Sequence, residues 1–86
     1  MSEVEKKIDQ CISELNPFRI FAPEIDQAVK ALKDLKNLVN EPTKENTEKA
    51  SKIVAEFLRQ ISPYASYIPT TFSNLKFVEE WLKRTE

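Results

Sequence analysis

The sequence of 86 residues contains no glycine, no histidine and only one cysteine. Without glycine it has no G-x-G-x-x-G turn for a dinucleotide, no P-loop for phosphate groups and no Asn-Gly or Asp-Gly hairpin turn. Without histidine it lacks the usual base of a catalytic triad and a common metal ligand. A single cysteine forms neither an internal disulfide nor a cysteine-rich zinc site. We therefore expect a protein that is not an enzyme and that holds no cofactor or metal.

An excess of charge of one sign and long apolar runs are also missing. Thirteen Lys and Arg side chains against fourteen Asp and Glu side chains give a net charge of −1, so we expect no broad basic surface for nucleic acid. The longest apolar run, as at residues 20–22, is far too short to span a membrane. No basic stretch followed by an apolar one marks a signal peptide. The expected location is the cytoplasm, and we expect no membrane partner.

Apolar residues recur at the spacing of an α-helix in four segments, and no segment alternates with the period of a strand. A capping box formed by Ser2 and Glu5 predicts the start of the first helix. Pro23 suits the first position of the second helix, and Thr43 or Thr47 caps the third. The apolar stripes are Val4, Ile8, Cys11, Ile12 and Leu15; Ile25, Ala28, Val29, Leu32, Leu35 and Val39; Ala50, Ile53, Val54, Phe57, Leu58 and Ile61; and Leu75, Val78, Trp81 and Leu82.

Prolines mark where these helices stop. Pro17 is expected to end the first helix because it disfavours the α conformation at Asn16. Ser62 and Pro63 end the third helix in the same way, and the fourth helix is expected from about Thr71. The predicted fold class is therefore all-α.

A weak internal match lies at an offset of 46 residues. It places residues 16–23 on residues 62–69, with both prolines and both aromatic residues coinciding, and the apolar stripes also match. We interpret residues 1–40 and 47–86 as two helix–connector–helix units joined by residues 41–46. Neither unit can bury its apolar face alone. The sequence predicts a single domain, a compact antiparallel four-helix array with approximate pseudo-two-fold symmetry, unless the chain instead dimerises.

The two proline-stiffened connectors carry paired aromatic residues, Phe18 and Phe21 in the first and Tyr64 and Tyr67 in the second. Such pairs can grip a peptide or a stacked base. They can also serve as an apolar cover over the end of a small bundle, and we favour this structural interpretation. Because tyrosine hydroxyls seek water or a partner, the second connector is expected to be the wetter one.

An unusual aromatic pair lies on the fourth helix. Phe77 is about 100° away from the stripe of Leu75 and Val78 and lies next to Trp81. The matching position in the first unit is Ala31. The pair is either an exposed anchor for a protein partner or part of a wide buried arc. Both interpretations stay open on the sequence alone.

Two further residues on the apolar stripes have a functional and a structural interpretation. Cys11 has no histidine to activate it, so we expect a small core residue rather than a nucleophile. Lys36 lies within the core-facing arc of the second helix. We expect its stem to rest on the core while its ammonium group reaches water.

These observations favour a small non-enzymatic protein that binds and regulates another protein. One alternative is a nucleic-acid-binding regulator that uses Lys30, Lys33 and the connector aromatics; another is a structural dimerisation domain. The partner-binding residues predicted from the sequence are Phe77, Trp81, Tyr64 and Tyr67, with Lys76 and Arg84 as charges at the rim.

Overall fold

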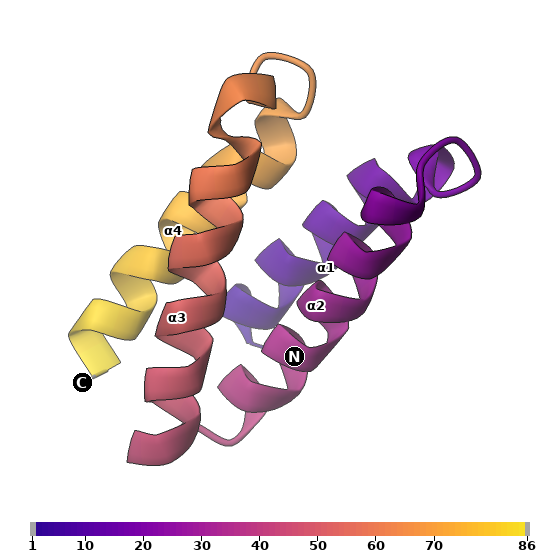
Figure 1. Cartoon of the computed structure of the whole chain (residues 1–86). Helices are drawn as coiled ribbons and strands as arrows, with labels where there is room; N and C mark the ends of the chain where they lie inside the picture. Colours follow the sequence, from indigo (N-terminus) through magenta and orange to yellow (C-terminus); the bar gives the residue numbers. More distant parts are fainter. Residues whose placement is uncertain (1, 86) are drawn as a thin grey trace.

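The computed structural model describes residues 2–85. Within them the chain forms four α-helices, two short 3₁₀ helices and no strand. Consecutive helices run antiparallel, and each packs against its neighbours in a ring, with α1 closing onto α4 (Figure 1). The predicted all-α four-helix array is thereby confirmed. The helices are α1 (Glu3–Leu15), α2 (Pro23–Asn40), α3 (Lys44–Ile61) and α4 (Pro69–Thr85).

Side-chain caps and prolines set the helix starts. The Ser2 hydroxyl accepts a hydrogen bond from the backbone N–H of Glu5 at 3.3 Å, as the capping box predicts. Thr43, one of the two candidates, caps α3 in the same way. Pro23 is the first residue of α2, as expected, and α4 begins on Pro69, two residues before the predicted start. A proline fits a first helical position because its missing N–H is not needed there.

The prolines end α1 and α3 by a route that differs from the predicted one. Asn16 and Ser62, which precede Pro17 and Pro63, remain in the right-handed α region. The expectation that Pro17 forces Asn16 out of that region is therefore wrong. Instead, each proline lacks the N–H that would continue the helical ladder. The chain then tightens into short 3₁₀ helices, η1 (Asn16–Phe18) and η2 (Ser62–Tyr64).

The helix ends around the two connectors follow the 46-residue offset, whereas the interfaces between helices do not. α1 and α3 end at Leu15 and Ile61, and α2 and α4 begin at Pro23 and Pro69. An exact two-fold relation would make the α1–α4 and α2–α3 interfaces alike. In the structure α1 packs against α4 much more extensively than α2 packs against α3.

A ladder of polar contacts explains the closer packing of α1 on α4. Asn74 is buried, and its side-chain amide nitrogen donates to the backbone oxygen of Lys7 at 3.0 Å and to the side-chain oxygen of Gln10 at 2.8 Å. One turn earlier on α4, the hydroxyl of Thr71 lies 3.5 Å from the backbone oxygen of Cys11. Groups buried in this interface are thus paired, as burial of polar atoms requires.

Glu14 completes this ladder by capping α4 from the neighbouring helix. Its two carboxylate oxygens accept the backbone N–H groups of Thr70 at 3.1 Å and Thr71 at 2.6 Å. These are first-turn donors that have no partner within their own helix. Partial burial alone raises the pKa of Glu14, but the hydrogen bonds from Thr71 and Thr70 outweigh it and hold the pKa below its ordinary value of 4.5.

Three matching positions on α2 and one on α3 carry apolar side chains, whereas Glu56 and Gln60, which match Gln10 and Glu14, bond to each other within α3. Ile25, Ala28 and Ala31 stand where α4 has Thr71, Asn74 and Phe77. Ile53 stands where α1 has Lys7, and like the three α2 residues it is only half-buried. An open depression of about 500 Å³ lies beside this interface. It is lined by Asp34, Asn37, Leu38, Lys49, Lys52 and Ile53.

The structure places Cys11 as expected, whereas the ammonium group of Lys36, which was expected to reach water, pairs with a carboxylate. Cys11 is fully buried among the core residues. Burial raises the pKa of its thiol to about 12, and the charge of Glu14 adds to the rise, so the thiol stays protonated at neutral pH. Lys36 is half-buried, and its ammonium nitrogen lies 2.9 Å from a carboxylate oxygen of Asp9, which ties α2 to α1.

Candidate functional site

All the large hydrophobic side chains that are clearly exposed within residues 2–85 belong to two short segments. We call residues 16–22 connector one and residues 62–68 connector two. Both connectors lie at the same end of the bundle, opposite the turn between α2 and α3 (Figure 1), and we call this the connector end. The exposed side chains are Phe18 at 45%, Ile20 at 87%, Phe21 at 77%, Tyr64 at 60% and Tyr67 at 78%.

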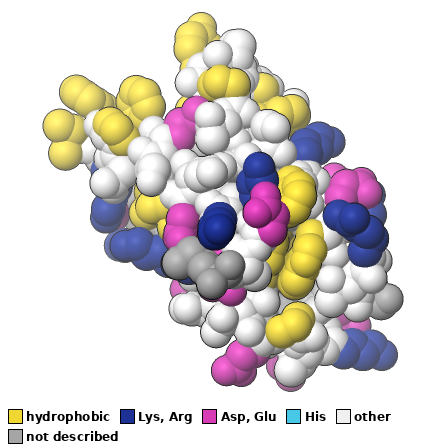
Figure 2. Space-filling model, turned by 180° about the vertical axis from the view of Figure 1, so that it is seen from behind, with side chains coloured by type: hydrophobic (Ala, Val, Ile, Leu, Met, Phe, Trp, Pro, Cys, Tyr) yellow, Lys and Arg dark blue, Asp and Glu magenta, His cyan; other side chains and the backbone are white. Residues whose placement is uncertain are grey.

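The backbone of each connector explains this exposure. In connector one, the N–H of Arg19 bonds to the oxygen of Asn16, and the N–H of Phe21 bonds to the oxygen of Phe18 at 3.1 Å. In connector two, the N–H of Tyr67 bonds to the oxygen of Tyr64 at 2.9 Å. Backbone groups are thus paired within the turn, and the aromatic side chains extend outward. Figure 2 shows hydrophobic side chains standing out from the tips at this end of the molecule.

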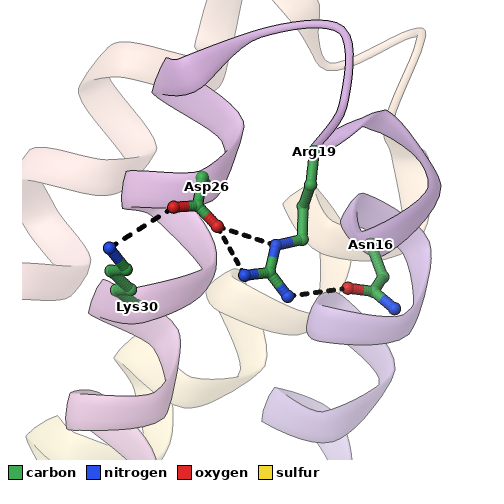
Figure 3. Close-up of polar contacts among 4 residues, drawn as sticks. All are labelled: Asn16, Arg19, Asp26 and Lys30. Atoms are coloured by element: carbon green, nitrogen blue, oxygen red, sulfur yellow. Dashed lines mark hydrogen bonds and ion pairs between the residues drawn. The ribbon is translucent and has the colours of Figure 1, made fainter.

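Arg19 anchors connector one to α2. Its guanidinium group donates two hydrogen bonds to one oxygen of Asp26, at 2.8 Å from Nε, and a third to the side-chain oxygen of Asn16 at 3.2 Å (Figure 3). Lys30 lies 3.4 Å from the other oxygen of Asp26. Hydrogen bonding from Arg19, supported by Lys30, lowers the pKa of Asp26. The residues after Arg19, including Ile20, are thereby carried on a turn that is tied at both ends.

Connector two has different residues at the matching positions. Ala65 stands where connector one has Arg19, and Phe72 stands where α2 has Asp26. The ring of Phe72 is half-buried against the core, and the ammonium nitrogen of Lys76 lies 5.8 Å from its centre. Ile68 also packs against the core. Connector two is therefore held by apolar contacts and by its own backbone bonds.

The expectation that the connector aromatics cover the end of the bundle is wrong. Ile61 and Ile68 pack against the core cluster that contains Leu15, whereas the rings at positions 21 and 67 are more than three-quarters exposed and so cover little of it. The expectation of a wetter second connector holds at one position, where Tyr64 is more exposed than Phe18. Tyr67 and its counterpart in connector one are equally exposed.

The aromatic pair on α4 has a different environment. Phe77 and Trp81 are half-buried and pack against the core. The ammonium nitrogen of Lys7 lies 5.4 Å from the centre of the Phe77 ring, which adds a cation–π contact across the α1–α4 interface. These contacts match the wide-arc interpretation more closely than the exposed-anchor interpretation.

The partner-binding residues predicted from the sequence do not form one surface. Tyr64 and Tyr67 lie at the connector end, but Trp81 and Arg84 lie toward the other end of α4, roughly 18 Å and 22 Å along the helix from its start at Pro69. Arg84 bonds to a backbone oxygen of its own helix, and Lys76 lies beside Phe72. These α4 residues therefore belong to a separate region of the surface.

The sequence-based prediction omitted Phe18, Ile20 and Phe21 from the partner-binding set. Their signal was present in the sequence, because an apolar run directly after a proline break cannot continue the buried stripe of the helix before it. The proposed Lys30 and Lys33 stripe, in contrast, is partly neutralised, since Lys30 is paired with Asp26.

Metal-binding clusters and membrane-spanning helices are absent from residues 2–85. No group of three or more His, Cys, Asp or Glu side chains in this range is arranged to hold a metal ion. No helix in it has the length and apolar character needed to cross a membrane. In comparisons with known proteins, no protein family, curated protein or solved structure matches this chain significantly. Within the described residues, the exposed hydrophobic side chains of the connector end are therefore the clearest candidate for a functional site.

Proposed function

We propose that this chain is a non-enzymatic protein-binding module whose contact surface is the connector end. The observation that carries the proposal is that the five clearly exposed large hydrophobic side chains of residues 2–85 all lie at this one end. With roughly 200 Å² for each large side chain, their exposed fractions leave about 700 Å² of mostly apolar surface, divided between the two tips. Exposed apolar patches of a few hundred Å² are often functional, and aromatic residues supply much of the binding energy at interaction sites.

The way the tips are built supports this proposal. Each connector pairs its own backbone groups, and Arg19 adds side-chain bonds to Asp26 and Asn16. Binding through such preorganised tips costs less conformational entropy than binding through a loose loop. The matched helix ends at the 46-residue offset support an origin of the two tips in related units.

The charge around the connector end favours a protein over a nucleic acid. The guanidinium of Arg19 is bound to Asp26, and Arg59, at the end of α3, is bound to Glu56. Binding of single-stranded nucleic acid combines stacking on aromatic rings with a basic groove that follows the phosphates. The rings are available here, but the nearby cations are already paired. We therefore propose that the chain is a regulatory protein and that it acts in the cytoplasm.

Site-specific photo-crosslinking tests this function. A photoreactive phenylalanine analogue replaces Phe21 or Tyr67, and Glu45 serves as control because its side chain is 77% exposed at the far end of α3. After irradiation in the native cell, defined protein adducts are expected from positions 21 and 67 and not from position 45. Equal adducts from all three positions, or adducts from position 45 alone, would show that the connector end is not the contact surface.

A further inference from the structure

We infer that the partner bound by the connector end is a second copy of this chain, in a head-to-head dimer. This inference rests on the proposed function, because it identifies the occupant of the same surface. It is carried by three features of the connector end: its apolar area, its two-tip shape and its nearly balanced charge.

The exposed apolar area suits a self-associating surface. Stable interfaces bury about 800 Å² on each partner, and the exposed side chains of the two connectors supply about 700 Å² of mostly apolar surface on each copy. Two copies that meet through this end would remove from water the large side chains that each leaves exposed. Flanking backbone and polar atoms add further area at the rim.

The two tips also allow a closed, symmetric contact. A dimer whose two-fold axis runs across the connector end, perpendicular to the line between the two tips, places connector one of each copy against connector two of the other. Phe21 and Ile20 then face the partner's Tyr67 and the partner's Tyr64. Aromatic rings gain from edge-to-face and offset contacts of this kind, and the tyrosine hydroxyls can stay at the wet rim.

The charges near the tips permit this contact with little repulsion. Near connector one, Arg19 and Lys30 balance Asp26 and Glu24. Near connector two, Arg59 is paired with Glu56. With Glu14, which caps α4 beneath connector two, three cations stand against four anions at this end. So small a net charge provides little steering toward a strongly acidic or basic partner. It also causes little repulsion between two copies of this surface.

Sedimentation and solution scattering test the inference together. The Cα atoms extend over 36 × 20 × 20 Å, and the long direction runs toward the connector end (Figure 1). A head-to-head dimer is therefore expected to reach about twice 36 Å, whereas a side-by-side dimer would remain close to 36 Å long. Sedimentation equilibrium over about 5 to 500 μM gives the dissociation constant, and small-angle scattering at the upper concentrations gives the length.

Substitutions in the connectors test which residues form the dimer interface. Phe21→Ser and Tyr67→Ser are each expected to weaken dimerisation at least 10-fold, roughly the effect of losing an interface hot spot, while Glu45→Ser leaves it unchanged. Because both side chains extend into solvent, the helical circular dichroism of the variants is expected to match that of the unsubstituted chain.

Three results would overturn the inference that a second copy occupies the connector end. They are a monomer up to the highest concentration, a dimer no longer than one bundle, or a Glu45→Ser variant whose dimerisation is weakened as much as that of the connector variants. A monomer that sediments with phosphatidylcholine vesicles would indicate a lipid surface in its place. A monomer that still forms adducts with other proteins from positions 21 and 67 would leave the proposed function standing. A monomer without such adducts would remove both.

Discussion

Two groups of aromatic residues that the sequence alone does not distinguish lie in different environments in the structure. The connector aromatics, such as Phe21 and Tyr67, extend into solvent, whereas Phe77 and Trp81 on α4 lie half-buried against the core. The first group lies beyond the helix ends on turns whose backbone bonds are already made. The second group lies on a helix that packs closely against α1. The difference teaches that aromatic content alone does not mark an interaction surface; the element that carries the ring decides its exposure.

The largest effect on stability is expected at the α4 pair. Trp81→Ala removes a large ring that packs on the core, and for its half-buried state we expect a loss of about 2 kcal/mol in the free energy of unfolding. Phe77→Ala is expected to cost a similar amount because it also removes the contact with Lys7. Urea unfolding measures both. Arg84→Ala, on the exposed side of the same helix, is the control.

A loss below about 0.5 kcal/mol for both α4 variants, the range of ordinary surface substitutions, would break the comparison. It would show that the α4 pair is not structural, and Phe77 and Trp81 would again be candidate contact residues.

The next largest effect is expected at Glu14, beneath connector two. Glu14→Gln weakens the bonds to the N–H groups of Thr70 and Thr71, and we expect a loss of about 1 kcal/mol near neutral pH. Because folding lowers the pKa of Glu14, its stabilisation is complete above the ordinary value of 4.5 and is lost as the pH falls through the lower, folded-state value. The variant is therefore expected to lose less stability than the unsubstituted chain on acidification.

Denaturant unfolding at a series of pH values checks this expectation, with Glu45→Gln as a matched control on an exposed helix start. An identical acid dependence in the Glu14→Gln variant and the unsubstituted chain would contradict the capping role of Glu14.

A smaller, local effect is expected at Arg19. Arg19→Ala removes the bonds to Asp26 and Asn16 but no core contact. We expect little change in global stability, together with hydrogen exchange of the Phe21 amide that is at least a few-fold faster, because the turn opens more often. The control is Arg59→Ala, which removes a comparable ion pair within α3. Unchanged exchange at connector one would show that Arg19 does not anchor it.

The smallest effect on stability is expected at the tips themselves. Phe21→Ser and Tyr67→Ser change side chains that are more than three-quarters exposed, so the free energy of unfolding should stay within about 0.5 kcal/mol of the unsubstituted value. Thermal unfolding at a protein concentration low enough to dissociate any dimer measures this free energy of unfolding. A loss comparable to that of Trp81→Ala would mean that the connector rings are structural after all.

The parts of the structure that follow from local rules were predictable from the sequence. The four apolar stripes, the Thr43 cap and the start of α2 at Pro23 depend on neighbours within one or two turns. The conformation of Asn16 was not predicted correctly, because a short 3₁₀ helix accommodates the proline that follows it.

The candidate site depends on contacts that helical periodicity does not describe. Arg19 reaches Asp26 across a turn, and Glu14 meets Thr71 from 57 residues away. The exposure of Phe21 follows from the direction of a turn after a helix end, where no repeating pattern applies. Sequence reasoning therefore identified the connector aromatics and included Tyr64 and Tyr67 among the partner-binding residues, but it favoured a covering role that their exposure does not match.

The most direct test of the connector end is an amide chemical-shift map over a concentration series. Amide spectra of isotope-labelled protein at about 10 and 500 μM bracket the weak end of interface affinities. If the connector end is the contact surface of the dimer, the shift changes concentrate in residues 16–22 and 62–68. Changes concentrated around Trp81 on α4 or beside the depression between α2 and α3, with none in the connectors, would contradict the account.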